Sequence, residues 1–464
     1  MRPLPLRVTA AALLLAACHA DDDTAGPEPI EDIAWAPHEE IGSLVTVTFS
    51  LHAPAEARVE FRPAGDEDWL STPAQTLPAG PASFLLLGLP FAQDFTFRVM
   101  ADFDTGPLQG EEHTGTTGPL PDGLPAARLN SADPARYDAT GRYLITSVDG
   151  TAGGWRPGTF WKVIVDRQGR TVWALPTPGQ LWTTYMRVAQ NGEDLLYDAF
   201  SYYAAWDGGA ASEVRAIKID GTPVHTWATP GGQHAYADLP DGSIAWGCSG
   251  FGLEHLDLVD LAGTRQTLWD CFDFQDERGI EGDCKHNSLS WDSASDSFLY
   301  SLYTSDTVVQ IDRASGATLR VFGEAHGDYT FEPEDSAFWW QHGAVFTEAG
   351  TLLLSTHTSP DHESPAQQTV AREYALDDDA QVLEQIWSFG EGSGCSATNA
   401  GEAHRLPNGD TLHNLGTCGI VREATPDGAV VWDLDWREGL SEDEADARLV
   451  GRSVFVEDLY AFAP

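Results

Sequence analysis

The sequence predicts an all-β protein in which a small β-sandwich is followed by a six-bladed β-propeller. Between residues 37 and 118, short runs of alternating apolar and polar residues follow one another about every dozen residues. Beyond residue 141, a strand–turn–strand unit recurs six times, and one position at the start of a hairpin recurs five times. A β repeat of about 40–50 residues is typical of a propeller with four strands in each blade.

The charge balance excludes some classes of partner. The chain of 464 residues has 26 Lys and Arg against 71 Asp and Glu, a formal net charge of -45. Such a surface repels nucleic acid and anionic membrane faces, so we expect no nucleic-acid partner. An anionic substrate would need Arg, His or backbone donors to hold it against this field.

The first 18 residues, MRPLPLRVTAAALLLAAC, predict a lipoprotein signal peptide. Two Arg flank the start, an apolar run follows, and Leu15 to Cys18 form a lipobox with Cys18 as the lipidated residue. The alternative is an ordinary signal peptide that ends in Cys. No other stretch has the ~18 apolar residues that a membrane helix needs, so we expect an extracytoplasmic protein held only by its lipid anchor.

The next segments divide by composition. Residues 19–36 are acidic and without periodicity, which predicts a tether. The β runs of residues 37–118 predict the sandwich, and a run such as Phe95 to Val99 resembles a fibronectin type III or immunoglobulin-like domain. Residues 119–140 are rich in Gly, Pro and Asp and predict a linker, so that the propeller would span residues 141–464.

The six units of the propeller share a strand, an Asp- and Gly-containing turn, and a second strand that ends near an aromatic or apolar residue. The closing residues are Trp173, Trp227, Trp269, Val321, Trp387 and Trp432. Their spacing varies from 42 residues (Trp227 to Trp269) to 66 residues (Val321 to Trp387), which indicates long loops. We expect the final run, residues 452–463, to close the ring by pairing with the first blade.

The recurring hairpin position is the candidate site. It lies eight residues before a turn glycine in four units, and the fifth unit is aligned through its strand. The position is occupied by Thr184, His234, His286, His342 and Gly401. The innermost strands of a propeller converge on one channel, so we expect the three histidines to share a site. The alternative is that the position only needs a donor to a neighbouring backbone.

Three kinds of chemistry fit converging histidines. They can bind zinc or copper, act as general acids and bases, or supply a nucleophile with donors for an anion.

Five cysteines remain after removal of Cys18, the lipidated residue: Cys248, Cys271, Cys284, Cys395 and Cys418. Cys271–Cys284 and Cys395–Cys418 are plausible disulfides by proximity, at least one thiol stays free, and no CxxC spacing suggests a zinc site.

Several runs resemble bacterial arylsulfate sulfotransferases across most of residues 141–464. They are DCKHNSLSWDSASDSFLYSLYTSDTVVQIDRASGATLRVFG, WWQHGAVFTEAGTLLLS, REYALDDDAQVLEQIWSFG, GEAHRLPNGDTL and SVFVEDLYAF. The resemblance implies a cofactor-free and metal-free enzyme that moves a sulfuryl group from an aryl sulfate to a phenol through a sulfated histidine. It also implies a β-sandwich before the propeller.

The resemblance carries over to single residues as follows. His342 matches the family's Gln-His position, and His286 matches a His-x-Asn-Ser position less well, since Lys285 takes that place by strict alignment. The family's anion-binding Arg after the Gln-His strand is missing, and Arg372 is the nearest candidate. Residues 388–403 contain no His where the family carries its sulfated one. His404 lies three positions off the repeat register, which points to the opposite strand face.

The sequence therefore predicts an arylsulfotransferase-like enzyme whose nucleophile is His342, His286 or His234. Two alternatives stay open: a lipid-anchored propeller that binds a ligand or partner without chemistry, and a metal site on the three histidines.

Overall fold

The computed structural model describes residues 29–151, 158–179, 181–201, 212–248, 254–281, 284–361, 364, 366–438 and 448–464. The signal peptide, Cys18 and the first part of the tether lie outside these residues. Strands make up most of the regular structure, and the one α-helix among the described residues is α2 (Cys271–Arg278). The predicted all-β class is confirmed. In the described part of the chain, no helix is long and apolar enough to cross a membrane.

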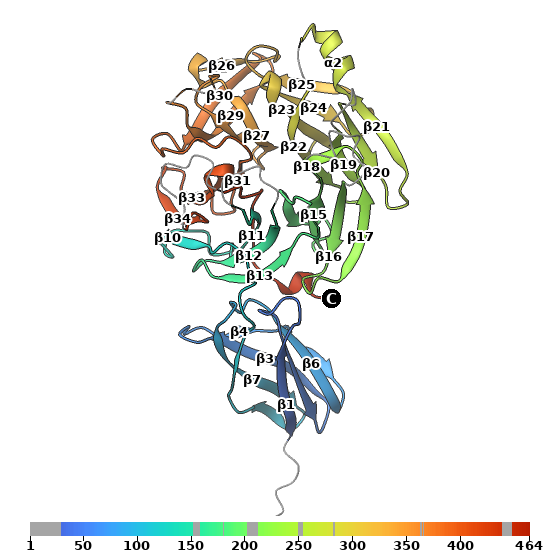
Figure 1. Cartoon of the computed structure of the whole chain (residues 1–464), viewed down its shortest axis with the longest axis vertical. Coiled ribbons are helices and arrows are strands. Elements are labelled where there is room, and N and C mark those ends of the chain that lie inside the picture. Colours follow the sequence, from blue (N-terminus) through green and yellow to red (C-terminus); the bar gives the residue numbers. More distant parts are fainter. Residues whose placement is uncertain are drawn as a thin grey trace, which may run out of the picture.

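Two antiparallel sheets form the N-terminal part, which lies below the rest of the molecule in Figure 1. The first sheet consists of β1 (Ile30–Pro37), β2 (Val45–Leu51) and β6 (Gly80–Leu86). The second consists of β3 (Ala55–Pro63), β4 (Leu70–Ser71), β5 (Gln75–Leu77), β7 (Asp94–Phe103), β8 (Gly106–Gln109) and β9 (His113–Thr116). Buried and less buried residues alternate along β3 and β7, because successive side chains point to opposite faces.

Six further sheets follow, and Figure 1 shows them arranged around a common centre. The first three contain β11 (Tyr143–Asp149), β12 (Phe160–Asp166) and β13 (Thr171–Pro176); β14 (Met186–Val188), β15 (Leu195–Ala199), β16 (Glu213–Ile217) and β17 (Pro223–Ala228); and β18 (Gly232–Asp238), β19 (Ile244–Cys248), β20 (His255–Val259) and β21 (Arg265–Asp270).

The last three sheets are built in the same way. They contain β22 (His286–Asp292), β23 (Ser297–Leu302), β24 (Thr307–Asp312) and β25 (Thr318–Phe322); β26 (Thr330–Glu332), β27 (Trp339–Phe346), β28 (Leu352–His357), β29 (Thr369–Asp377) and β30 (Val382–Phe389); and β31 (Glu402–Arg405), β32 (Thr411–Asn414), β33 (Ile420–Ala424) and β34 (Val430–Asp435). Short 3₁₀ helices are η1 (Tyr303–Ser305), η2 (Glu334–Ser336), η3 (Gly416–Cys418) and η4 (Tyr460–Phe462).

Two segments from the ends of this region complete its sheets. β10 (Arg128–Ala132) pairs with β34, and β35 (Val454–Val456) pairs with β11. The expected pairing of the final run with the first sheet is therefore confirmed. The predicted linker, residues 119–140, was too long, because part of it forms β10, an edge strand of the last sheet. The predicted tether was also too long, because β1 is held by pairing with β2.

The six repeated aromatic or apolar residues have a structural reason. Each lies on the second strand of its strand–turn–strand unit, and four of the five tryptophans donate an indole N–H to the following sheet. Trp173 donates to the carbonyl of Ile219 (2.6 Å) and Trp387 to that of Pro426 (3.1 Å). Trp432 of the last sheet donates to the carbonyl of Arg167 in the first (3.0 Å). The repeated turn therefore receives the indole of the preceding unit, which links successive sheets and joins the last to the first.

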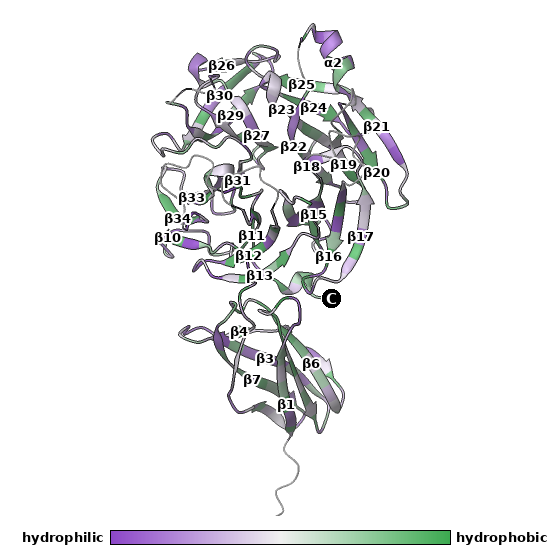
Figure 2. Ribbon diagram, viewed as in Figure 1, coloured by the Kyte–Doolittle hydropathy of each residue, from purple (hydrophilic) through white to green (hydrophobic). Residues whose placement is uncertain are grey.

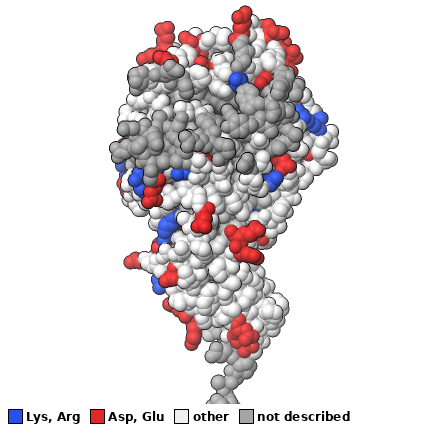
Figure 3. Space-filling view, viewed as in Figure 1, with Lys and Arg blue, Asp and Glu red and all other residues white. Residues whose placement is uncertain are grey.

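Apolar strand residues pack between neighbouring sheets, and Figure 2 shows hydrophobic segments in green on strands of both parts. Both proposed disulfides are present: Cys271–Cys284 at the start of α2, and Cys395–Cys418. Cys248 is free and buried. Acidic side chains are spread over the visible surface of both parts, with basic ones scattered among them (Figure 3).

Candidate active site

One cavity gathers the five residues of the repeated hairpin position. Thr184, His234, His286, His342 and Gly401 all line a cavity of about 290 Å³. They lie before or within the first half of β14, β18, β22, β27 and β31, one from each of five sheets. The same place in successive units thus reaches the same place in the molecule, which is why the register carried spatial information.

The three histidines of the cavity are neutral at physiological pH. Burial lowers the pKa of His234 to about 4, and that of His286 and His342 to about 3. The proximity of other cationic groups adds to this, since a charged His234 would oppose charge on both His286 and His342. A neutral imidazole has a lone pair on one ring nitrogen, so these rings can act as nucleophiles or bases.

The tautomer of His342 is set by the backbone two residues earlier. Its Nδ1 lies 3.0 Å from the carbonyl oxygen of Trp340. A carbonyl can only accept, so Nδ1 carries the proton and the lone pair is on Nε2. Trp340 has a φ of 51°, which is unusual for a bulky residue. Its N–H donates to Oδ1 of Asp306 (2.6 Å), which helps to hold the strained carbonyl in place.

The residues beside His342 fix the strand that carries it. The side-chain amide of Gln341 donates to Oγ of Ser301 (3.1 Å) and to the carbonyl of Thr307 (3.0 Å) in the preceding sheet. Gly343 has a φ of 61°, and a Cβ there would lie 2.4 Å from Cβ of Glu402. The Gln-His-Gly sequence therefore locks β27 between its two neighbours, with His342 at the cavity.

His286 is held differently. It is buried, its ring lies 5.2 Å from that of Tyr300, and neither ring nitrogen makes a well-formed hydrogen bond within the described residues. The backbone of Gly247 lies close to Nε2 and slightly favours the protonated ring, but burial outweighs it.

The buried arginine of the cavity is Arg452, which the sequence did not single out. Its Nε donates to Oε2 of Glu402 (2.6 Å), and its guanidinium lies 3.8 Å from the ring centre of Tyr185. Burial alone would raise the pKa of Glu402, but Arg452 and His404 lower it to about 2, so the carboxylate is ionised. Arg452 comes from the closing segment just before β35, and the only sequence signal was the expected return of that segment to the first sheet.

Two predicted residues lie elsewhere. His404 does not line the cavity; its Nε2 lies 2.9 Å from Oε2 of Glu402, so it contacts the partner of Arg452. Arg372 does not line the cavity either, because on β29 its Nη1 donates to the carbonyl of Ala337 (2.6 Å). Its place as an anion-binding candidate is taken by Arg452.

Aromatic and polar groups complete the lining. The rings of Tyr303 and Trp340 lie 6.2 Å apart at the cavity, where Lys285 and Asn287 are also found. Asn287 donates to the carbonyl of Gln341 (2.6 Å). The three cavity histidines do not form a metal-ligand group: in the described residues the one set of His, Cys and carboxylate ligand atoms within 4.8 Å of one another lies elsewhere.

The family model "Arylsulfotransferase (ASST)" matches residues 252–437. This segment is therefore similar to the arylsulfotransferase family. The resemblance found in the sequence is therefore confirmed. The arylsulfotransferase segment contains His286 and His342, whereas His234 and Arg452 lie on either side of it.

No curated protein matches this chain significantly. Among solved structures, a Bacteroides caccae protein of unknown function is 15% identical, with a TM-score of 0.44 over 68% of this chain and 99% of that one. A virginiamycin B lyase from Staphylococcus aureus in complex with quinupristin is 10% identical, with a TM-score of 0.39 over 71% and 100%. A Lactobacillus plantarum protein is 14% identical, with a TM-score of 0.38 over 86% and 100%. Likenesses at this level carry no argument about the site.

Proposed function

We propose that this protein transfers a sulfuryl group from an aryl sulfate to a phenol, with His342 as the nucleophile. The observation that carries the proposal is the cavity itself. Three neutral histidines and one buried arginine line it, and an arylsulfotransferase segment supplies two of the histidines.

His342 is favoured over the other two histidines by its fixed tautomer. With Nδ1–H bound to the carbonyl of Trp340, the Nε2 lone pair is available for attack, and among the described residues Nε2 makes no hydrogen bond. His234 and His286 stay neutral, so they serve as uncharged hydrogen-bonding groups for the sulfuryl oxygens or the acceptor hydroxyl.

Arg452 is the candidate for stabilising the anion. Its Nε donates to Glu402 and its Nη1 lies 3.5 Å from the carbonyl of Leu289, to which it donates, so Nη2 is the nitrogen left to bind the sulfuryl oxygens. Lys285 adds a second positive charge to the lining. These local cations counter the repulsion that a net charge of -45 exerts on a sulfate ester.

The proposed reaction balances without a cofactor. Nε2 of His342 forms a bond to sulfur while the bond from sulfur to the aryl oxygen breaks, and the phenolate leaves. The acceptor phenol oxygen then attacks sulfur, the N–S bond breaks, and the free imidazole is restored. The proton that the acceptor loses equals the one that the leaving phenolate takes up. The rings of Tyr303 and Trp340 offer apolar faces for both aryl groups.

The test is incubation of the purified full chain with 4-nitrophenyl sulfate and a phenol. We expect 4-nitrophenol release that depends on the acceptor. With the acceptor omitted, the peptide that contains His342 should gain the mass of one SO₃ group. Absence of release with every aryl sulfate tried would refute the enzyme proposal. Release with the adduct on His234 or His286 would keep the reaction and reassign the nucleophile.

We further propose that the six sheets of the larger part are the six blades of a closed propeller, and that the two N-terminal sheets form a sandwich. The indole contacts that link successive sheets, including the one from Trp432 to Arg167, support a closed ring. An experimental structure with another number of blades would contradict this architecture.

We also propose an extracytoplasmic protein that is lipid-anchored through Cys18. The lipobox supports the anchor, and the disulfides Cys271–Cys284 and Cys395–Cys418 fit an oxidising compartment. In a host that processes lipoproteins, the wild type should partition with membranes and the Cys18→Ala variant should not. Equal partitioning of the two would refute the anchor.

A further inference from the structure

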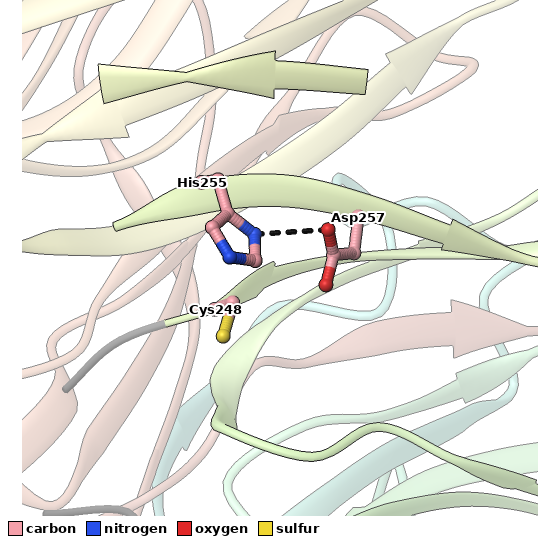
Figure 4. Close-up of side chains that lie close together, drawn as sticks. All are labelled: Cys248, His255 and Asp257. Atoms are coloured by element: carbon pink, nitrogen blue, oxygen red, sulfur yellow. Dashed lines mark ion pairs between the residues drawn. The ribbon is translucent and has the colours of Figure 1, made fainter. Parts of the chain in front are cut away.

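A second group of potential ligand side chains, Cys248, His255 and Asp257, lies outside the cavity, on the hairpin formed by β19 and β20. Cys248 is paired directly opposite His255, and Asp257 follows two residues later on the same strand. Side chains two residues apart on a strand share a face, and a residue directly opposite shares it too. The pairing therefore brings a thiol, an imidazole and a carboxylate to one face of the sheet, as Figure 4 shows.

The three side chains form a compact, buried group. Cys248 is 2% exposed, His255 7% and Asp257 0%, and their ligand atoms all lie within 4.8 Å of one another. Nδ1 of His255 lies 2.9 Å from Oδ1 of Asp257. The sulfur of Cys248 lies 3.6 Å from the carbonyl oxygen of Pro230, and the side chain of Arg265 also interacts with it.

We propose that Cys248, His255 and Asp257 bind a divalent transition-metal ion of the zinc type. Thiolate, imidazole and carboxylate are the ligand types that zinc takes, and three protein ligands leave a fourth position for water. Bond lengths of about 2.0–2.3 Å place tetrahedral ligand atoms roughly 3.5 Å apart. Small side-chain rotations bring atoms that already lie within 4.8 Å to that spacing.

The surroundings of Asp257 fit the outer shell of such a site. Nε of Arg265 donates to Oδ2 of Asp257 (2.7 Å), and Oγ1 of Thr267 donates to Oδ1 (2.8 Å). Outer-shell donors of this kind orient a ligating carboxylate. Burial would raise the pKa of Asp257, but hydrogen bonds from His255, Thr267 and Arg265 lower it, so the carboxylate is ionised. The charge of Arg265 opposes a cation, and a thiolate at Cys248 would offset it.

The metal would also bear on the cavity, without being part of it. Gly247 precedes Cys248, and a Cβ on Gly247 would lie 2.5 Å from Nε2 of His286. A metal that ties Cys248 to β20 would hold the strand against which His286 packs. The proposed site therefore lies next to the cavity and would help to hold β19 in place.

The experiment is a zinc titration of the purified full chain after chelator treatment, in competition with a chromogenic zinc dye. We expect one tight site in the wild type, and a loss of about 100-fold or more in affinity in Cys248→Ser and His255→Gln. The His342→Ala variant, which alters the cavity, and His225→Gln, on the outer strand β17, should bind as the wild type does. Cobalt should give a thiolate-to-metal charge-transfer band in the wild type.

Three results would overturn the proposal. One is the absence of stoichiometric zinc binding by the wild type. Another is unchanged binding in both cluster variants, and the third is loss of binding in His342→Ala, which would place the metal in the cavity. If the cluster variants fail to fold, the cobalt spectrum of the wild type decides, because no thiolate band means that Cys248 is not a ligand.

Discussion

Two buried groups that contain histidine lie on either side of Gly247, which packs against His286 and precedes Cys248. They differ in the charges around the histidine. In the cavity, His234, His286 and His342 have no carboxylate partner among the described residues, and burial leaves them neutral. On the other side, His255 contacts the ionised Asp257 beside the thiol of Cys248. The same side chain is thus suited to nucleophilic attack in one place and to metal binding in the other. What separates them is whether burial comes with an anion.

The largest effect on turnover is expected at His342. We expect His342→Ala to lower turnover by ~10³–10⁶-fold, because the proposed nucleophile is lost. The matched control His225→Ala, on β17 outside the cavity, should keep turnover within about twofold, since it removes a histidine without touching the cavity lining. Initial rates of 4-nitrophenol release measure both. A His342→Ala variant with wild-type rates would remove His342 from the mechanism.

The next effect is expected at Arg452, the cation that distinguishes the cavity from a purely neutral site. Loss of one preorganised donor to the developing charge lowers turnover by ~10²–10³-fold. Arg452→Gln alone also leaves Glu402 buried without its partner, which costs ~3–5 kcal/mol. The double variant Arg452→Gln/Glu402→Gln removes that imbalance. It should fold as the wild type does and still lose turnover.

The single variant Glu402→Gln completes this pair. It keeps Arg452 but loosens its position, and we expect a smaller loss of about 10–100-fold, mainly in kcat/KM. Wild-type rates in the double variant, with stability restored, would assign Arg452 a structural role only.

The backbone at Gly343 gives a smaller effect. Alanine there is strained at a φ of 61° and would place Cβ 2.4 Å from Cβ of Glu402, so the strand beside His342 must shift. We expect turnover to fall by about 10–100-fold. Gly350→Ala is the control, since it is strained at a φ of 77° but meets open space at the hairpin turn. It should cost about 1 kcal/mol of stability and leave turnover unchanged. Equal turnover in the two variants would contradict the positioning role of Gly343.

Much of the site could be predicted because equivalent residues of successive repeats occupy equivalent places in the fold. Thr184, His234, His286, His342 and Gly401 occupy one place in successive units, and the fold brings that place to one cavity. The tryptophan spacing carried the same information, since four of the five repeated indoles donate a hydrogen bond to the following sheet. The two disulfides were inferred from proximity in sequence.

Other features depend on contacts that no local pattern records. Arg452 reaches the cavity because the C-terminal segment returns to β11, some 300 residues earlier in the chain. The sequence predicts a linker at the position of β10, because the strand with which β10 pairs, β34, lies about 300 residues further along the chain. The metal-ligand group needs Cys248 paired opposite His255, and a C-x₆-H-x-D spacing matches no common zinc motif. For Arg452 and β10 the missing information was a long-range strand pairing, and for the metal-ligand group it was the register of the β19–β20 hairpin.

Chelation should separate the two histidine groups. Removing the metal from the Cys248 cluster is expected to lower the free energy of unfolding, by about 2.7 kcal/mol relative to protein at a free zinc concentration of 100 times Kd. Turnover should stay within about threefold, because none of the proposed catalytic steps uses a metal. Thermal unfolding and initial rates on the same samples measure both quantities. Turnover that is abolished by the chelator and restored by zinc would mean that the two groups form one site.

The smallest expected change is the dependence of turnover on pH. Since burial lowers the pKa of His234 to about 4 and of His342 to about 3, both stay neutral across the usual range. We expect turnover to vary less than about threefold between about pH 5 and 8 and to fall only below about pH 4.

The free energy of unfolding should depend on pH differently from turnover. As the pH falls through about 6.5, histidines of the unfolded chain become protonated, whereas the buried histidines of the folded chain stay neutral. The unfolded state therefore binds more protons, and the free energy of unfolding decreases toward about pH 3. His342→Gln removes one such group and should make that decrease shallower in urea titrations. A rate profile with a midpoint between about pH 6 and 7 would show that the essential histidine titrates normally, and would contradict the neutral cavity on which the comparison rests.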